Sequence, residues 1–208
     1  PLAGAQIGGV TTYTITGTAS STGTSVLKVK VSTNGGKSWH LATDTSGNES
    51  WASWSFNWKM SSNTADDDGD IDPGEKKVIK DGSYIIKSRA KSHSGCVETA
   101  GPGVTVTVDN TEPVTTASAA GYVFGSMTAV SPVSVTLTAS DGSGSGVAAG
   151  SPEYCIDTSD TCTPNLAFGA AINVTCAPSS TCTQFVRYRS LDRAGNSEAL
   201  QSAIVKQN

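Results

Sequence analysis

The sequence predicts an all-β protein that contains two β-sandwiches in tandem. Short runs of alternating apolar and polar residues recur along the chain, and clusters of Gly, Asn, Asp and Pro separate them. No stretch of useful length shows the 3.6-residue repeat of an amphipathic helix. A pattern near the end of the first half also recurs near the end of the second half. These observations indicate two similar β units and very little helix.

The first half of the chain carries one series of expected strands. Val, Thr, Ile and Tyr dominate these runs, and β-branched and aromatic residues suit a pleated, half-buried strand. In VLKVKV and VTVTV one face is apolar and the other is polar, as in a strand that buries one face. The expected strands are 11–19, 25–33, 50–58, 84–92 and 104–110.

The second half carries a similar series after a short junction. In VDNTEPV (108–114) a strand ends and a polar stretch leads to Pro113, so we place the boundary there. The expected domains are therefore 1–110 and 111–208. The expected strands of the second domain are 134–141, 153–157, 171–176, 185–192 and 202–207.

The internal repeat supports this division. KSRAKSHSGCVETA (87–100) aligns with RYRSLDRAGNSEAL (187–200), and 187 minus 87 gives an offset of 100 residues. A period of about 100 residues is the size of one immunoglobulin-type sandwich. The matched identities are Arg89 with Arg189, Gly95 with Gly195 and Glu98 with Glu198.

Several motifs resemble the immunoglobulin-like repeat modules of large bacterial secreted and cell-surface proteins. They are TVTVDNTEPVT at the junction, VSTNGGKSW in the first half, and SLDRAGNSEA with DGSGSGVA in the second. The D-x-AGN-x-E turn is similar to the OmpL47-type variant, although Ser92 and Cys96 replace its Asp and Asn in the first half. The resemblance implies two tandem immunoglobulin-like β-sandwiches, a surface location, structural or adhesive work and no catalysis.

An acidic segment, NTADDDGDIDPGEKK (63–77), carries the sharpest chemical signal. Crowded carboxylates repel one another, and Ca²⁺ relieves this because it takes roughly six to eight oxygen ligands. The D-x-D-x-D spacing matches the start of an EF-hand loop, but Ile71 stands where that loop needs Gly. We predict a Ca²⁺ loop inserted between two strands of the first domain; the alternative is a solvated acidic hairpin tip. The predicted ligands are Asp66, Asp68, Asp70, Asp72 and Glu75.

Four of the 5 cysteines lie in the second half. Four cysteines allow three connectivities, and we expect two local disulfides, each closing a short polar loop in an oxidising compartment. Zinc is the less favoured alternative, because the spacings are long and no His lies nearby. Cys96 is either a buried thiol or a cross-link to another chain. The expected pairs are Cys155 with Cys162 and Cys176 with Cys182.

A weaker cation site could lie near the junction. Its oxygen-bearing residues would be Asp109, Asn110 and Glu112, with Asp192 and Asn196 from a turn of the second domain. We favour the simpler interpretation of a polar linker that Pro113 stiffens.

Composition and charge narrow the functional classes. The formal charge is −4, the pI is about 5.1 and charged residues make up 15% of the chain. This acidic balance argues against nucleic acid, and no apolar run is long enough to insert into a membrane. The two His residues, His40 and His93, belong to no recognisable catalytic signature, so we predict a protein that is not an enzyme.

The function predicted from the sequence is a calcium-stabilised structural module of an extracellular or cell-surface protein, of the stalk or adhesin type. One alternative is a self-assembling filament subunit, in which the segment 1–19 adds a strand to a neighbour. Another is an adhesion module that binds carbohydrate or protein; Trp54, Phe56 and Trp58 are expected in the core rather than at such a site. The expected partners are neighbouring modules or copies of the chain, or else a glycan or a surface protein.

Overall fold

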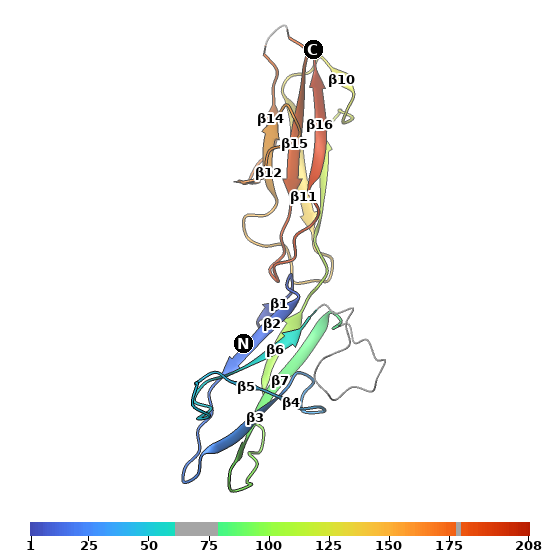
Figure 1. Ribbon diagram of the computed structural model, residues 1–208. Helices are drawn as coiled ribbons and strands as arrows, with labels where there is room; N and C mark the ends of the chain where they lie inside the picture. The colour runs from blue at the N-terminus through green and yellow to red at the C-terminus, as the bar shows by residue number, and fades with distance from the viewer. Residues whose placement is uncertain (61–78, 178–179) are drawn as a thin grey trace, which may run out of the picture. The chain divides into compact units, whose positions relative to one another are not determined.

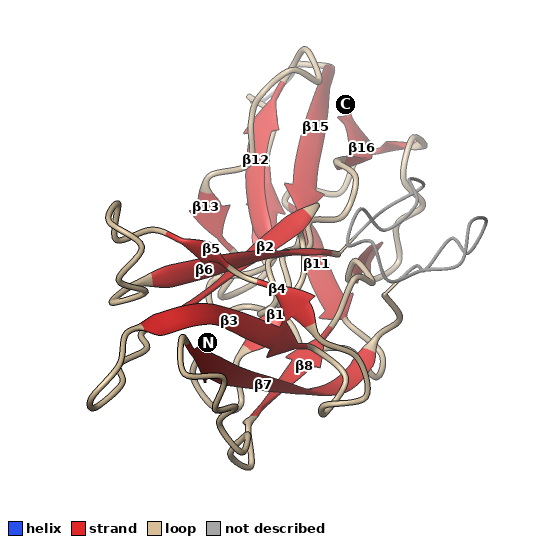
Figure 2. Ribbon diagram, turned by 60° about the horizontal axis from the view of Figure 1, so that its bottom comes forward, coloured by secondary structure: helices blue, strands red, loops and turns tan. Residues whose placement is uncertain are grey.

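The computed structural model describes residues 1–60, 79–177 and 180–208. The chain divides into two compact units, Pro1–Asn110 and Thr111–Asn208. Within the described residues all regular elements are β-strands, as the sequence predicts, and none is a helix (Figure 2). The described part therefore contains no helix that could span a membrane.

The first unit contains two sheets. One has the strand order β1-β8-β7-β3-β4, and the other has the order β2-β6-β5 (Figure 1). The pair β1 and β8 is parallel, and the other pairs are antiparallel. The strands are β1 (Gln6–Ile7), β2 (Thr12–Gly17), β3 (Val26–Ser32), β4 (His40–Leu41), β5 (Thr43–Asp44), β6 (Trp54–Lys59), β7 (Gly82–Ser92) and β8 (Val104–Val108).

The core of the first unit lies between these two sheets, the arrangement of a β-sandwich. Val29 and Val31 of β3 are 1% and 0% exposed because alternate residues of a strand point to the same face. From the other sheet, β6 contributes Trp54 and Trp58, and Phe56 packs against the same cluster. The predicted placement of these three aromatic residues in the core is therefore confirmed.

The start of β6 differs from the prediction. We expected a strand over 50–58, but β6 begins at Trp54. Glu49 and Trp51 have φ angles of 55° and 59°, in the left-handed region that breaks an extended strand. Gly17 accommodates Trp54 on the neighbouring strand, since a Cβ at residue 17 would lie 2.2 Å from the indole ring.

The second unit also contains two sheets. Their strand orders are β10-β16-β15-β12-β13 and β14-β11-β9. A hydrophobic core again draws on both sheets: Val135 of β11 and Val186 and Val205 of the larger sheet are fully buried. The strands are β9 (Val114–Ala119), β10 (Met127–Thr128), β11 (Val133–Ser140), β12 (Glu153–Asp157), β13 (Leu166–Ala167), β14 (Ile172–Val174), β15 (Cys182–Arg189) and β16 (Gln201–Gln207).

The larger sheets of the two units follow the same plan. In each sheet a two-residue strand (β1 or β10) pairs in parallel with the last strand of the unit (β8 or β16). The last strand also pairs in antiparallel fashion with the long strand that precedes it in the chain (β7 or β15). The turn before the last strand is also repeated at the 100-residue offset. Its three backbone N–H···O bonds join Ser92 to Cys96, Gly95 to Ser92 and Glu98 to Ala90, and likewise Asp192 to Asn196, Gly195 to Asp192 and Glu198 to Ser190.

Candidate functional site

The predicted calcium ligands lie outside the described residues. Asp66, Asp68, Asp70, Asp72 and Glu75 all fall within 61–78. In the chain this segment follows β6, which ends at Lys59, and precedes β7, which begins at Gly82.

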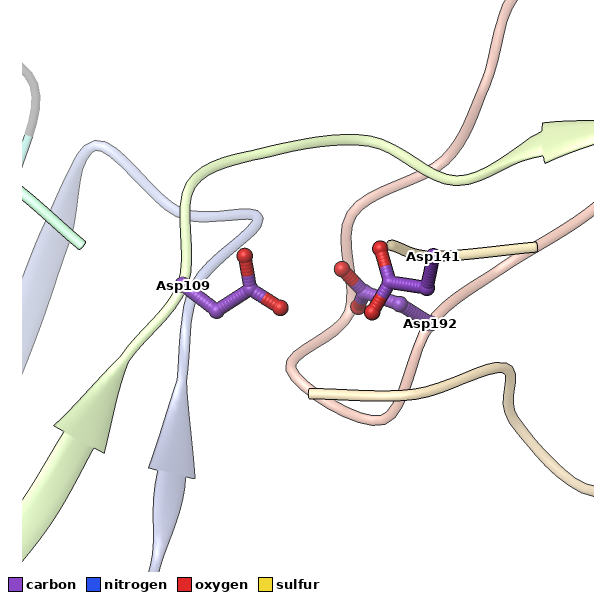
Figure 3. Close-up of side chains that lie close together, drawn as sticks. All are labelled: Asp109, Asp141 and Asp192. Atoms are coloured by element: carbon purple, nitrogen blue, oxygen red, sulfur yellow. The ribbon is translucent and has the colours of Figure 1, made fainter. Parts of the chain in front are cut away.

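Within the second unit, the structure brings together two carboxylates that we call the acidic pair, Asp141 and Asp192. Asp141 follows β11, and Asp192 follows β15, a strand of the other sheet. A carboxylate oxygen of each lies within 4.8 Å of one from the other (Figure 3). The two side chains reach this position from segments about 50 residues apart in the chain.

Each member of the acidic pair is held by its own turn. Asp141 accepts a hydrogen bond of 2.6 Å from the N–H of Gly146. Asp192 accepts bonds of 2.7 and 2.8 Å from the N–H groups of Gly195 and Asn196, and the Asn196 side-chain amide also donates to it. Backbone amides therefore position both carboxylates before any ligand arrives.

The two turns are also tied to each other. The N–H of Arg193 donates to the carbonyl of Gly146 at 2.9 Å, and the N–H of Ala194 donates to the Ser145 hydroxyl at 3.1 Å. An isolated bridge pairs Val147 with Asp192. Hydrogen bonds between the two turns therefore fix the distance between the two carboxylates of the acidic pair.

The acidic pair offers oxygen ligands of the type that Ca²⁺ prefers, and a cation between the two carboxylates would offset their mutual repulsion. The weak cation site predicted from the sequence included Asp192 but not Asp141, which belongs to the DGSGSGVA motif. A usable signal was that both Asp residues follow the end of a long strand. Of the other residues in that group, Asn110 is bound within the first unit, where its N–H donates to Asp81 at 2.7 Å.

A third buried carboxylate of this unit, Glu198, is bonded within the protein. It is 7% exposed and accepts hydrogen bonds from the N–H of Ser190 at 2.5 Å and the N–H of Thr115 at 2.8 Å. The Thr115 hydroxyl donates to the same carboxylate. Glu198 thus joins the start of β9 to the end of β15, and both of its carboxylate oxygens accept hydrogen bonds from the protein.

Both disulfides of the second unit have the predicted pairing. Cys155 bonds Cys162 with a Cα–Cα distance of 6.2 Å, and Cys176 bonds Cys182 with a distance of 5.9 Å. Cys96 is a free thiol and is exposed, so the interpretation as a buried thiol is wrong. The zinc alternative is also wrong, because the four cysteines are consumed in disulfides.

The first disulfide encloses a carboxylate with a shifted pKa. Partial burial opposes ionisation of Asp157, but hydrogen bonds of 2.8 Å from the N–H groups of Thr161 and Cys162 outweigh it. Hydroxyl groups of Ser159 and Thr161 add to this effect. Together they hold the pKa of the Asp157 carboxyl well below its usual range.

Comparison with solved structures yields a distant likeness. No family model matches the chain, and no curated protein matches it. A solved structure of fibronectin(III)-like modules of Clostridium thermocellum CbhA aligns with 100% of this chain and 90% of its own, at 17% sequence identity and a TM-score of 0.44.

Proposed function

We propose that this chain is a non-catalytic structural module of an extracellular or cell-surface protein, of the stalk or adhesin type. The observation that carries the proposal is the pair of local disulfides in the second unit. Disulfides form and persist in oxidising compartments, and they stabilise units of about 100 residues whose cores are small. A structural role requires a stable fold and no catalytic site. Such a role accounts for both the disulfides and the small cores.

The repeated plan of the two units supports a modular role. Their larger sheets share one strand order, and the turn before the last strand recurs with the same three backbone bonds. We infer that each unit is an immunoglobulin-like β-sandwich and that the two stand in tandem. The resemblance of the second unit's D-x-AGN-x-E turn to OmpL47-type modules belongs to this proposal.

The surroundings of the two histidines support a non-catalytic role. His40 stacks on Phe56 with ring centroids 5.7 Å apart. Among the described residues, Nδ1 of His93 has as partners the hydroxyl of Ser25 at 3.0 Å and its carbonyl oxygen at 3.3 Å. A Ser–His–Asp arrangement instead places a carboxylate on that nitrogen to orient the ring.

Calcium binding by the segment 66–75 is the second part of the proposal. Six carboxylates within ten residues need a counter-ion, and a D-x-D-x-D spacing lets successive side chains converge on one cation. Within the described part of the second unit, the acidic pair could hold a second Ca²⁺ ion. Bound Ca²⁺ would stabilise the native chain by mass action, since the unfolded chain lacks the assembled sites.

The test is a calorimetric titration of EDTA-stripped protein with Ca²⁺, followed by thermal unfolding. At about one hundred times Kd, binding to one site should add about 2.7 kcal/mol to the free energy of unfolding. Asp68→Asn with Asp70→Asn should abolish this shift if the segment binds Ca²⁺, whereas Asp192→Asn should preserve it. The absence of both heat and a stability shift in the unaltered chain would reject calcium binding.

No observation on the described residues specifically favours self-assembly by strand addition. The segment 1–19, which could have completed a neighbour's sheet, forms β1 and β2 and pairs within its own unit. The outer strands of both five-stranded sheets are only two residues long, whereas β2 and β9, which are outer strands of the three-stranded sheets, are six residues long. The filament alternative therefore stays a prediction, to be checked by light scattering over a range of concentrations.

A further inference from the structure

One face of the larger sheet of the first unit is strongly cationic. We call it the cationic face, and it consists of Lys28 and Lys30 of β3 with Lys87, Arg89 and Lys91 of β7. Alternate residues of a strand share a face, and β3 and β7 pair side by side, so these five side chains project together. They are five of the 14 Lys and Arg residues of a chain whose formal charge is −4.

The register places like charges opposite one another. Lys28 lies directly across from Lys91, and Lys30 lies directly across from Arg89. Like charges in opposed positions destabilise a sheet. Among the residues that the structure describes, no carboxylate forms an ion pair with any of these cations, because the ion pairs found there join Arg187 to Asp160 and Arg189 to Glu153. A repulsive arrangement without an internal counter-charge indicates an external anion.

Protection of a sheet edge does not explain the whole arrangement. Lysines often block unwanted pairing along edge strands. β8 pairs with residues 82–86 of β7 and β3 pairs with residues 87–92, so the stretch of β7 with the three cations has a named strand on one side only. Lys30, in contrast, lies between Arg89 of β7 and Leu41 of β4, an interior position where a charge is not needed to block an edge. Solubility does not explain it either, since scattered charges serve that purpose without placing cations in register.

The surface is shaped as well as charged. The Arg89 guanidinium lies 4.1 Å from the centroid of the Trp39 ring, whose Nε1–H is fixed by a 3.0 Å hydrogen bond to the Gly36 carbonyl. This cation–π contact holds Arg89 in place before a ligand binds. The cations line a shallow depression of about 100 Å³, formed by Lys28, Lys30, Arg89, Ala90, Lys91 and Val97.

A polar cleft of about 540 Å³ involves the other face of the same two strands, because Val29 of β3 and Ala90 of β7, which line it, face the hydrophobic core. Its lining also includes the acidic residue Glu98, so the cleft is not part of the cationic face.

We propose that the cationic face binds a linear anionic polysaccharide with carboxylate or sulfate groups. Alternate residues along β7 repeat every ~6.7 Å, so Lys87, Arg89 and Lys91 form a row of cations along which an extended polyanion can lie. The disulfides favour polysaccharide over nucleic acid, because they belong to an oxidising compartment outside the cell interior. This inference goes beyond the structural role and is independent of Ca²⁺.

The test measures binding of the full chain, in EDTA, to oligogalacturonate and heparin oligosaccharides of defined length, with dextran as the neutral probe. The charged probes should bind saturably and more weakly as salt is raised, while dextran should not bind. Lys28→Gln with Lys91→Gln should raise Kd about tenfold. The matched control, Lys80→Gln with Lys206→Gln, also takes the formal charge from −4 to −6 and should leave Kd within about twofold.

Thermal unfolding separates binding from folding in this test. Removal of Lys28 and Lys91 relieves an opposed like-charge pair, so the melting temperature should stay equal or rise while binding weakens. Lys30→Gln with Lys87→Gln provides a second pair of substitutions on the same face. Equal weakening by the control, or no saturable binding of either charged probe, would overturn the proposal. Tighter binding of poly-L-glutamate or single-stranded DNA would show that the occupant is a different macromolecule.

Discussion

Single buried residues connect distant parts of the second unit. Glu198 receives N–H groups from Thr115 and Ser190, of which Thr115 is 83 residues away in the chain. Its counterpart in the repeat, Glu98, is exposed, and its carboxylate accepts the N–H of Ala90 at 2.9 Å. The same residue type therefore occupies the same turn in a buried environment (Glu198) and in an exposed one (Glu98). Removal of the carboxylate should lower the free energy of unfolding substantially only at the buried position.

We expect Glu198→Ala to lower the free energy of unfolding by about 3 kcal/mol, because it leaves two buried N–H groups without an acceptor. Glu98→Ala serves as the matched control and should cost less than about 1 kcal/mol, since water can replace its carboxylate. Urea unfolding followed by far-UV circular dichroism measures both values. Equal losses for the two variants would contradict the buried role of Glu198.

Asp157 predicts a specific pH dependence. Its folded-state pKa lies below the unfolded value of about 3.9, so its ionised form stabilises the protein above that pH. This contribution is lost as pH falls below about 4 toward the lowered folded-state pKa. The difference in melting temperature between the unaltered chain and Asp157→Asn should therefore shrink between pH 7 and pH 2. A difference that stays constant over this range would argue against the lowered pKa.

At the scale of elements, strand patterns were easier to predict than strand ends. The alternating run in β11 gives buried Val133, Val135 and Leu137, as expected from its sequence. In contrast, β9 (Val114–Ala119) was not predicted, because VTTASA is weakly apolar and becomes a strand by pairing with β11 over six residues. Pairing partners far along the chain therefore decided the strand that local pattern could not indicate.

The disulfides act on short connections between elements. The paired cysteines are 7 residues apart in the first disulfide and 6 residues apart in the second. Replacement of either pair by Ser should lower the free energy of unfolding by about 2–3 kcal/mol. Cys96→Ser should change stability by less than about 0.5 kcal/mol, because that thiol is exposed and unbonded. Calorimetry on the three variants tests this contrast. A large loss for Cys96→Ser would indicate a role for that thiol that the described contacts do not contain.

On the scale of the whole molecule, each unit has its own hydrophobic core. One cluster contains only residues of the first unit, and the other contains only residues of the second. A unit with its own core can fold as a domain by itself. The strand pairing is consistent with two such domains, since each unit contains every strand of its larger sheet.

We therefore expect residues 1–110 and 111–208, expressed separately, each to unfold cooperatively. All four tryptophans lie in the first unit, so tryptophan fluorescence of the full chain reports the unfolding of that unit alone. Its midpoint should match that of the isolated 1–110 fragment. A fragment that shows no cooperative transition would contradict the assignment of an independent core.

Properties that depend on neighbours along the chain could be predicted from the sequence alone. These are the all-β class and the inward faces of strands such as β3. The local disulfide pairs were expected as one of three possible connectivities, and the structure has that connectivity. Side-chain alternation and short loop closure are local, so the pattern of residues specifies them. The repeated turn is local for the same reason.

Contacts between residues far apart in the chain could not be predicted in this way and are known from the folded structure. The acidic pair, the bonds of Glu198 to Thr115, and the opposed cations Lys28 and Lys91 all depend on sheet register and on turns that pack together. A shift of one residue in the pairing of β3 with β7 would send either set of cations to the opposite face. Register is settled by the packing of the whole core, which is why the cationic face became visible only in the folded chain.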